Sequence, residues 1–450
     1  MNSDNDPVPS SNAALLTRVD SAALGGRLRA ARLAAGLTQS QLAAGIVATS
    51  FVSLVESGRR RPHLDVLTAL VERAGASLEL VLSGMTRDRQ DAVQSTLDLA
   101  ELSLSSEDPS MALGVADAVL DDLVGMNAPE LFENALRLRA SAREAAGDLD
   151  GAVTDLETLT AESVSDVRWV RDLISLSRCL RESGRLDEAI AVAESRQAQV
   201  ERLGLSATTE AVQLTITTAG AYIQRGDLGH GLRTCKRALA DAVRYRLPVA
   251  QAAALWNASA VFEARGQTEE ALTMALQALE LFEGSGDTRN LGRLRNHVAN
   301  IQLSLQPPDA AGAIEMLRLA RKELDWSTAG ALDAARHRLT TATALELLGQ
   351  YEEATTELEA SVSLSPPNAV ELLASQAAMR GRLAAAWGDL DLARRHYQDG
   401  VAMLTGSGAD TDAAKLWYEL GRILHRLDEP ELAADAFRRA GVSQGLQIGS

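Results

Sequence analysis

The sequence predicts an all-α protein in two parts, a head of five helices followed by about nine helical hairpins stacked into a solenoid. Hydrophobic residues make up 46% of the 450 residues and aromatic residues only 3%. Alanine and leucine must therefore fill the core, which suits closely packed helices. Small residues also recur about every 40 positions beyond residue 111, and such a fixed period is typical of stacked helical repeats.

Residues 1–20 are predicted to form a disordered tail. The opening stretch, MNSDNDPVPSSN, has neither a cationic start nor an apolar run, so we expect neither a signal peptide nor an anchor. We see no apolar run of membrane length, and we expect no membrane partner. Cys179 and Cys235 lie far apart and form no disulfide framework, which suits a reducing cytosol and predicts a cytoplasmic protein.

The head is predicted at residues 21–83. Thr38 is a suitable cap for a short helix, Gly45 permits a tight turn, and Gly58 ends the next helix. Pro62 and Gly75 bound a further helix. The five predicted helices begin near residues 21, 39, 49, 64 and 77.

The third predicted helix, at about 49–57, has two faces. Val52 and Val55 lie three residues apart and should face inward. The residues left on its other faces are free to meet a groove of DNA: Thr49, Ser50, Ser53 and Leu54. A cationic patch suited to phosphate contacts follows directly: Arg59, Arg60 and Arg61.

Residues 22–83 resemble the lambdoid-repressor or Cro-like (XRE) helix-turn-helix family. The matching stretches are LRAARLAAG from Leu28, GLTQ at 36–39 and LVESGRRRP at 54–62. The resemblance implies a head that binds double-stranded DNA and a structural pair between Arg32 and Glu56. It also implies that Gln39 meets phosphate or a base edge, and that further residues approach bases: Thr49, Ser50, Phe51 and Leu54.

Two features depart from the usual pattern of that family. The segment between the paired helices is one residue shorter, which leaves the register of residues 46–48 open. Phe51 and Leu54 are apolar where polar readers are common. They either touch thymine methyl groups or pack within the head.

Charge is distributed unevenly along the chain. The formal net charge is −17, yet residues 1–90 carry ten Arg against eight acids, a net of +2. Residues 91–450 hold the remaining −19. A basic head joined to an acidic body is consistent with DNA binding by the head alone.

The repeat body is predicted at residues 87–445, after a hinge at 84–86. Small residues recur at intervals of 37 to 42 at the start of each second helix, where they let two helices approach closely. In most hairpins a Gly five residues earlier permits the reversal. The small residues are Ala112, Ala152, Ala189, Gly231, Ala271, Ala313, Ala354, Ala393 and Ala433.

These units resemble tetratricopeptide repeats (TPR) lengthened to about 40 residues. The last is the clearest, with Ala433, Phe437 and Ala440 at the small, aromatic and small positions. Cys235 stands where another unit would carry the aromatic, so we expect it to be a core residue. The order of head and repeats resembles the peptide-sensing regulators of the RRNPP group.

The TPR resemblance also implies which positions line the concave surface. The lining has nine basic and four acidic members, a net of +5, which predicts an anionic effector such as a peptide with a free carboxylate. Alternatively, several of these arginines pair with acids of the next repeat and only hold the stack together. The basic members are Arg137, Arg171, Arg178, Arg181, Arg295, Arg336, Arg382, Lys415 and Arg422; the acidic ones are Glu101, Glu144, Glu263 and Glu346; Trp256, Gln302 and Tyr418 add apolar and polar contacts.

An enzyme is not expected. The six His lie singly without metal-ligand spacing, and no phosphate-binding Gly loop follows a strand, so we predict no metal and no cofactor. The hypothesis is a transcription regulator that binds a palindromic operator as a homodimer and whose repeats bind a peptide or small effector. The alternative is a TPR scaffold that docks a partner protein, with the head serving for localisation.

Overall fold

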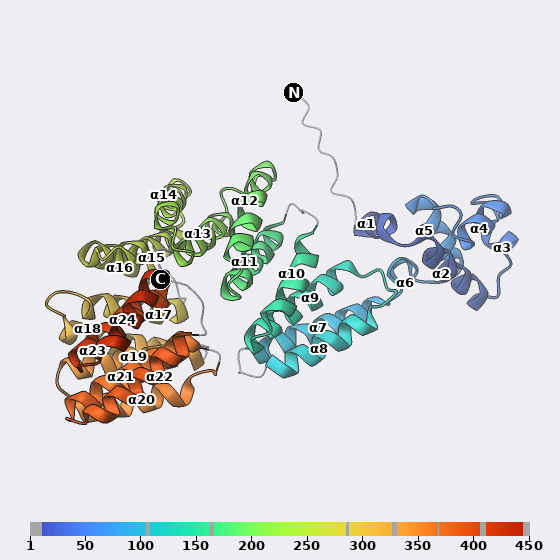
Figure 1. Cartoon of the computed structure of the whole chain (residues 1–450). Helices are drawn as coiled ribbons and strands as arrows, with labels where there is room; N and C mark the ends of the chain where they lie inside the picture. The colour runs from blue at the N-terminus through green and yellow to red at the C-terminus, as the bar shows by residue number, and fades with distance from the viewer. Residues whose placement is uncertain are drawn as a thin grey trace. The chain divides into compact units, whose positions relative to one another are not determined.

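The computed structural model describes residues 11–104, 109–161, 166–284, 288–325, 331–367, 369–405 and 411–443 (Figure 1). Every regular element in these ranges is an α-helix, which confirms the predicted fold class. The chain divides into two compact units, residues 1–161 and 162–450, and each is described by itself below.

The head occupies the start of the first unit. Leu24, Leu28, Leu42 and Leu67 are almost completely buried in its core. Thr38 caps the third helix as predicted, within a capping box completed by Gln41. Its helices are α1 (Ser11–Arg18), α2 (Ser21–Ala34), α3 (Gln39–Ala43), α4 (Thr49–Glu56), α5 (Leu64–Arg73) and α6 (Leu78–Ser83).

Helix α1 lies within the stretch for which the sequence predicts a disordered tail. Residues 1–10 of that tail lie outside the described residues, but 11–18 are helical. Leu16 and Val19 are buried in the head core, and α1 packs against α5 and α6. The prediction is therefore corrected for residues 11–20, because the burial of these apolar side chains stabilises a helix too short to persist alone.

Two helical hairpins complete the first unit. They are α7 (Arg87–Leu104) with α8 (Pro109–Asp122), and α9 (Pro129–Ala146) with α10 (Leu149–Thr160). Met85, Leu97 and Leu136 belong to one buried cluster, so Met85, two residues after the end of α6, is part of the core of these hairpins.

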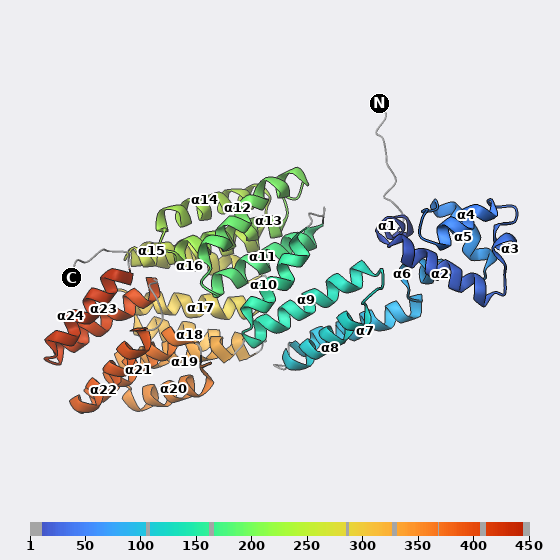
Figure 2. The same cartoon turned by 45° about the vertical axis from the view of Figure 1, so that its right-hand side comes forward.

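The described residues of the second unit form seven further hairpins. Figure 2 shows their helices from a second side. Each odd-numbered helix packs against the even-numbered helix that follows it. The helices are α11 (Val167–Glu182), α12 (Leu186–Arg202), α13 (Thr209–Gln224), α14 (Leu228–Arg244), α15 (Pro248–Ala264), α16 (Thr268–Phe282), α17 (Thr288–Leu303), α18 (Ala310–Asp325), α19 (Ala331–Leu347), α20 (Tyr351–Leu364), α21 (Val370–Ala386), α22 (Leu390–Thr405), α23 (Thr411–Arg426) and α24 (Pro430–Ser443).

The repeat pattern read from the sequence is confirmed. The nine small residues all lie in the second helices of the hairpins and are buried. The reversal glycines adopt the left-handed conformation that favours glycine, with φ between 73° and 84°: Gly147, Gly184, Gly266, Gly349 and Gly388. The described residues thus form nine hairpins in all, two in the first unit and seven in the second.

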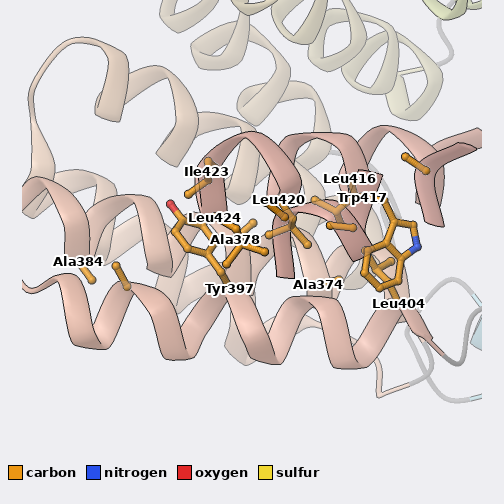
Figure 3. Packing of buried hydrophobic residues seen from close by; sticks show 14 residues of the cluster. Ala374, Ala378, Ala384, Tyr397, Leu404, Leu416, Trp417, Leu420, Ile423 and Leu424 are labelled. Carbon is orange, nitrogen blue, oxygen red and sulfur yellow. The ribbon is translucent and has the colours of Figure 1, made fainter. Parts of the chain in front are cut away.

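The last two hairpins show how the few aromatic residues are accommodated (Figure 3). Tyr397 and Trp417 are buried among leucines and alanines. A Cβ atom at Gly381 would lie 2.7 Å from the Tyr397 ring, and one at Gly421 would lie equally close to the Phe437 ring. Glycine on the first helix therefore makes room for an aromatic ring from the second.

The two cysteines lie in the interior of the protein. Cys179 and Cys235 are both buried, and burial raises the pKa of the Cys235 thiol to about 12. Cys235 is thus a core residue, as expected. None of the described helices is long and apolar enough to span a bilayer.

Candidate nucleic-acid interface

Helix α4 has one buried face and one exposed face. Val52 and Val55 are fully buried, as predicted. The exposed side chains follow one another at helical spacing on a single face, which we call the α4 stripe: Thr49, Ser50, Ser53, Leu54 and Ser57. The structure thus brings together, on the solvent side of the helix, the four residues that the sequence left free to meet a groove: Thr49, Ser50, Ser53 and Leu54.

Phe51 lies at the edge of the α4 stripe and is half-buried. Its ring packs against the head core, while the Arg60 guanidinium carbon lies 4.7 Å from the ring centre. A cation over an aromatic face is attracted by the ring quadrupole. This contact holds Arg60 beside the stripe.

The three arginines after α4 have different environments. The backbone N–H groups of Arg59 and Arg60 both donate to the Leu54 carbonyl, and both side chains are exposed. The guanidinium group of Arg61, by contrast, donates hydrogen bonds to the backbone carbonyls of Thr17 and Val19, each at 2.5 Å. Arg61 therefore ties the end of α1 to the segment that follows α4, and Arg59 and Arg60 form the cationic patch beside the α4 stripe.

The predicted structural pair is a buried ion pair. Arg32 Nε lies 2.6 Å from Glu56 Oε1, Arg32 Nη2 lies 3.0 Å from Glu56 Oε2, and both side chains are less than 10% exposed. Arg32 also donates to the Leu37 carbonyl, and Gln39 Nε2 donates to Glu56 Oε2 at 2.8 Å. The amide of Gln39, which the family resemblance assigns to phosphate or a base edge, is thus held by Glu56.

This network keeps Glu56 charged. Burial alone would raise the pKa of Glu56, but the hydrogen bonds from Arg32 and Gln39 outweigh it and hold the pKa below its ordinary value. The Glu56 hydrogen bond in turn raises the pKa of Arg32. The pair connects the end of α4 with α2 and with the start of α3, so it fixes the orientation of the exposed stripe.

A close helix crossing supports the same orientation. A Cβ atom built on Gly25 of α2 would lie 2.2 Å from the Val55 carbonyl oxygen and 2.8 Å from that of Glu56. A Cβ on the neighbouring Gly26 would meet nothing within 4 Å. Only glycine at position 25 lets α2 and α4 approach so closely.

The segment predicted to be a hinge is packed in the structure. Met85 is buried, and its N–H donates to Ser83 Oγ at 3.0 Å. Gly84 has a φ of 88°, and a Cβ there would meet Arg27 and Met126 at 2.8 Å. Residues 83–85 are therefore packed against the head and the hairpins that follow it, whereas Thr86 is exposed.

Two side chains join the head to the loop between α8 and α9. Arg27 of the head donates to the carbonyls of Leu82 at 3.0 Å and Gly125 at 2.8 Å. Asn127 donates back to the carbonyls of Leu15 at 2.9 Å and Leu82 at 3.2 Å. We call these contacts the head junction. Sequence reasoning missed both residues, because their bonds reach across 45 to 112 positions and leave no local pattern.

The residues predicted to bind an effector fall into separate places. Arg137 lies in the first unit, where it lines a shallow groove between α7 and α9 with Asp98 and Glu101. All the other basic, aromatic and amide members of the lining belong to the second unit. Most arginines of the set have acidic neighbours: Arg137 with Glu133, Arg171 with Glu210, Arg181 with Glu182, Arg295 with Glu283 and Glu323, and Arg382 with Glu346.

Some of these pairs link successive repeats. Arg171 of α11 reaches Glu210 of α13 at 2.7 Å, and Arg382 of α21 reaches Glu346 of α19 at 3.0 Å. Arg295 is buried. These pairs fit the alternative that the arginines hold the stack together. The remaining members are exposed or half-buried: Arg178, Trp256 and Gln302 are half-buried, and Arg336, Tyr418 and Arg422 are exposed.

One aromatic and cationic cluster lies in the second unit. The Trp256 ring is 6.3 Å from that of His297 and 5.8 Å from the Arg293 guanidinium carbon. His297 Nε2 lies 2.8 Å from Ser259 Oγ. Burial lowers the pKa of His297, the Glu263 carboxylate opposes this effect, and the charge of Lys415 lowers the pKa further. The sequence analysis found Trp256 and Lys415 but not Arg293 and His297.

Comparison with known proteins agrees with both parts of the chain. Residues 23–83 match the helix-turn-helix domain family, and residues 414–440 match the tetratricopeptide repeat family. No curated protein matches the chain by sequence. The chain thus contains a helix-turn-helix domain and a tetratricopeptide repeat.

Three solved structures have a similar fold. A Rap protein complexed with competence and sporulation factor is 14% identical, with a TM-score of 0.53 over 79% of this chain and 98% of that one. The apo quorum sensor NprR from B. thuringiensis is 13% identical, with a TM-score of 0.50 over 79% and 99%. Apo RapI is 12% identical, with a TM-score of 0.50 over 79% and 98%. At these identities the likeness concerns the fold.

Proposed function

We propose that this protein is a DNA-binding transcription regulator whose repeat body binds an anionic peptide or small effector that changes its affinity for DNA. The observation that carries the DNA-binding role is the α4 stripe, which is exposed, fixed by the Arg32–Glu56 pair and bordered by Arg59 and Arg60. An exposed helix face flanked by cations has the features needed to enter a major groove and contact its phosphates.

The effector role is supported by the exposed basic residues of the lining, Arg336 and Arg422, and by similar folds. The structurally similar Rap protein was solved with the competence and sporulation factor, and NprR is a quorum sensor. In this chain the Trp256 cluster combines an apolar ring with Arg293 and Lys415 nearby. We propose that this cluster, with the exposed Arg336 and Arg422, receives a carboxylate-bearing ligand.

The regulator is proposed to act as a homodimer. One head buries little DNA surface, so two heads on a palindromic site are needed for tight binding. Adjacent major grooves recur about every 34 Å, and the dimer must match that spacing or a multiple of it. Because residues 83–85 are packed and the head junction ties the head to the loop between α8 and α9, we propose that the head moves together with α7–α9. An effector would then alter head spacing at other joints of the solenoid.

Replacing Arg59 and Arg60 together by alanine should weaken binding to all DNA sequences and flatten its salt dependence. Each lost phosphate contact lowers the slope of log affinity against log salt by about 0.9, so the double variant should lose about 1.8. The measurement is fluorescence anisotropy with DNA duplexes across a salt series. A double Ala variant of Arg318 and Arg438, exposed arginines outside the head, is the control for net charge. An unchanged slope in the head variant would contradict the phosphate contacts.

The effector role predicts that ligand changes DNA affinity without any partner protein. A low-molecular-mass extract of the cells that make the protein should shift the affinity of the purified protein for its operator. Methyl esterification of the extract, which removes carboxylate charges, should abolish that shift. If the untreated extract leaves the affinity unchanged, the effector proposal fails and docking of a partner protein becomes the better account of the repeat body.

A further inference from the structure

The α4 stripe lacks the side chains that usually distinguish bases by paired hydrogen bonds. Its exposed members are Thr49, Ser50, Ser53, Leu54 and Ser57, none of which is an arginine, lysine, asparagine or glutamine. Arginine or lysine reads guanine, and asparagine or glutamine reads adenine, through two parallel hydrogen bonds. Hydroxyl groups bond to several bases and discriminate less.

The amide side chains nearest to the stripe are already engaged. Residues 38–58 contain two of them, Gln39 and Gln41. Gln39 donates to the buried Glu56, and Gln41 accepts hydrogen bonds from the backbone and hydroxyl of Thr38. Arg60 is stacked on Phe51 at the edge of the helix. None of these groups replaces the missing reader on the exposed face of α4.

The distinctive group on the stripe is apolar. Leu54 is 37% exposed, and the half-buried Phe51 ring borders the same side of the helix. In the major groove the one apolar feature that differs between base pairs is the C5-methyl group of thymine. We infer that this head recognises its operator through thymine methyl groups that contact Leu54, with the serine hydroxyls adding bonds of low selectivity. This inference rests on the proposed DNA-binding function.

The test uses the full-length protein and duplexes selected by it from a random pool. Each thymine of the selected motif is replaced in turn by deoxyuridine, which keeps the hydrogen-bonding pattern and removes only the methyl group. Loss of one buried methyl contact should lower affinity about fourfold. The same replacement at thymines outside the motif should leave affinity unchanged.

Variants of the protein assign the contact to Leu54. Leu54→Ala should bind the thymine duplex as weakly as the parent protein binds the deoxyuridine duplex. Replacing thymine by deoxyuridine should then lower the affinity of this variant little further. Leu80→Ala is the matched control, because Leu80 is 39% exposed in α6 of the same head but lies off the α4 stripe. It should retain the full preference for thymine.

The outcomes separate the inference from the proposed function. A motif whose affinity is insensitive to deoxyuridine at every thymine, or a motif without thymine, overturns methyl recognition and leaves DNA binding standing. If Leu54→Ala still shows the fourfold preference, the methyl contact exists but Leu54 does not make it, and the inference fails. If no sequence is enriched above the random pool, sequence-specific DNA binding itself fails.

Discussion

Replacing Glu56 by alanine is expected to destabilise the head by about 3–5 kcal/mol, because it leaves the buried Arg32 guanidinium without its counter-charge. Arg32 and Glu56 join α2 to the end of α4, so the loss should open these helices first. DNA affinity should fall toward that for random sequences, because the α4 stripe loses its fixed orientation. The Glu56→Gln variant keeps one acceptor for Arg32 and should lose less stability than Glu56→Ala.

Hydrogen exchange measures this effect locally, since amide protection in α2 and α4 reports the free energy of opening the head alone. Glu72→Ala is the control, because Glu72 is an exposed carboxylate on α5 of the same head. In this variant the free energy of opening the head should stay within about 0.5 kcal/mol of that of the parent protein. If Glu56→Ala behaves like Glu72→Ala, the ion pair does not stabilise the head.

Replacing Gly25 by alanine should separate α2 from α4. The new Cβ would lie 2.2 Å from the Val55 carbonyl oxygen, so the two helices must shift apart. Overpacking of this kind typically costs about 1–3 kcal/mol, and contact with backbone rather than a flexible side chain favours the upper end of that range. DNA affinity should fall with stability, because the same shift moves the recognition face of α4.

Gly26→Ala is the matched control for that variant. Gly26 is the next residue of the same helix, and a Cβ there meets nothing within 4 Å. Alanine should stabilise the helix by about 1 kcal/mol through its higher helix propensity. Thermal unfolding and hydrogen exchange of α2 should therefore move in opposite directions for the two variants. Equal effects of the same sign would contradict the close crossing.

In the repeat body, the period of the sequence predicted both the buried small residues and the glycines at the reversals. The small residues at the start of each second helix, such as Ala271 and Ala433, are buried where the period placed them. Reversal glycines such as Gly349 have the positive φ that their spacing predicts. Both features repeat locally, because every hairpin solves the same packing problem with its nearest neighbours.

The lining of the repeats shows where a sequence pattern stops being sufficient. Position alone groups Arg171, Arg295 and Arg382 as effector contacts, but each has an acidic neighbour on another helix. A repeat register predicts which face a side chain occupies. It does not predict whether that side chain already forms an ion pair with a carboxylate from another helix.

The primary sequence was sufficient for the all-α class, the nine hairpins and the helix-turn-helix, because each depends on spacing within one repeat or one motif. The Arg32–Glu56 pair was predicted from the resemblance of that motif to a known family. Only the tertiary structure decided the folding of α1, the close crossing at Gly25, the role of Arg61 and the head junction through Arg27 and Asn127. Those features depend on contacts between segments far apart in the chain. Such contacts form only once the elements have packed, so no local pattern of residue types encodes them.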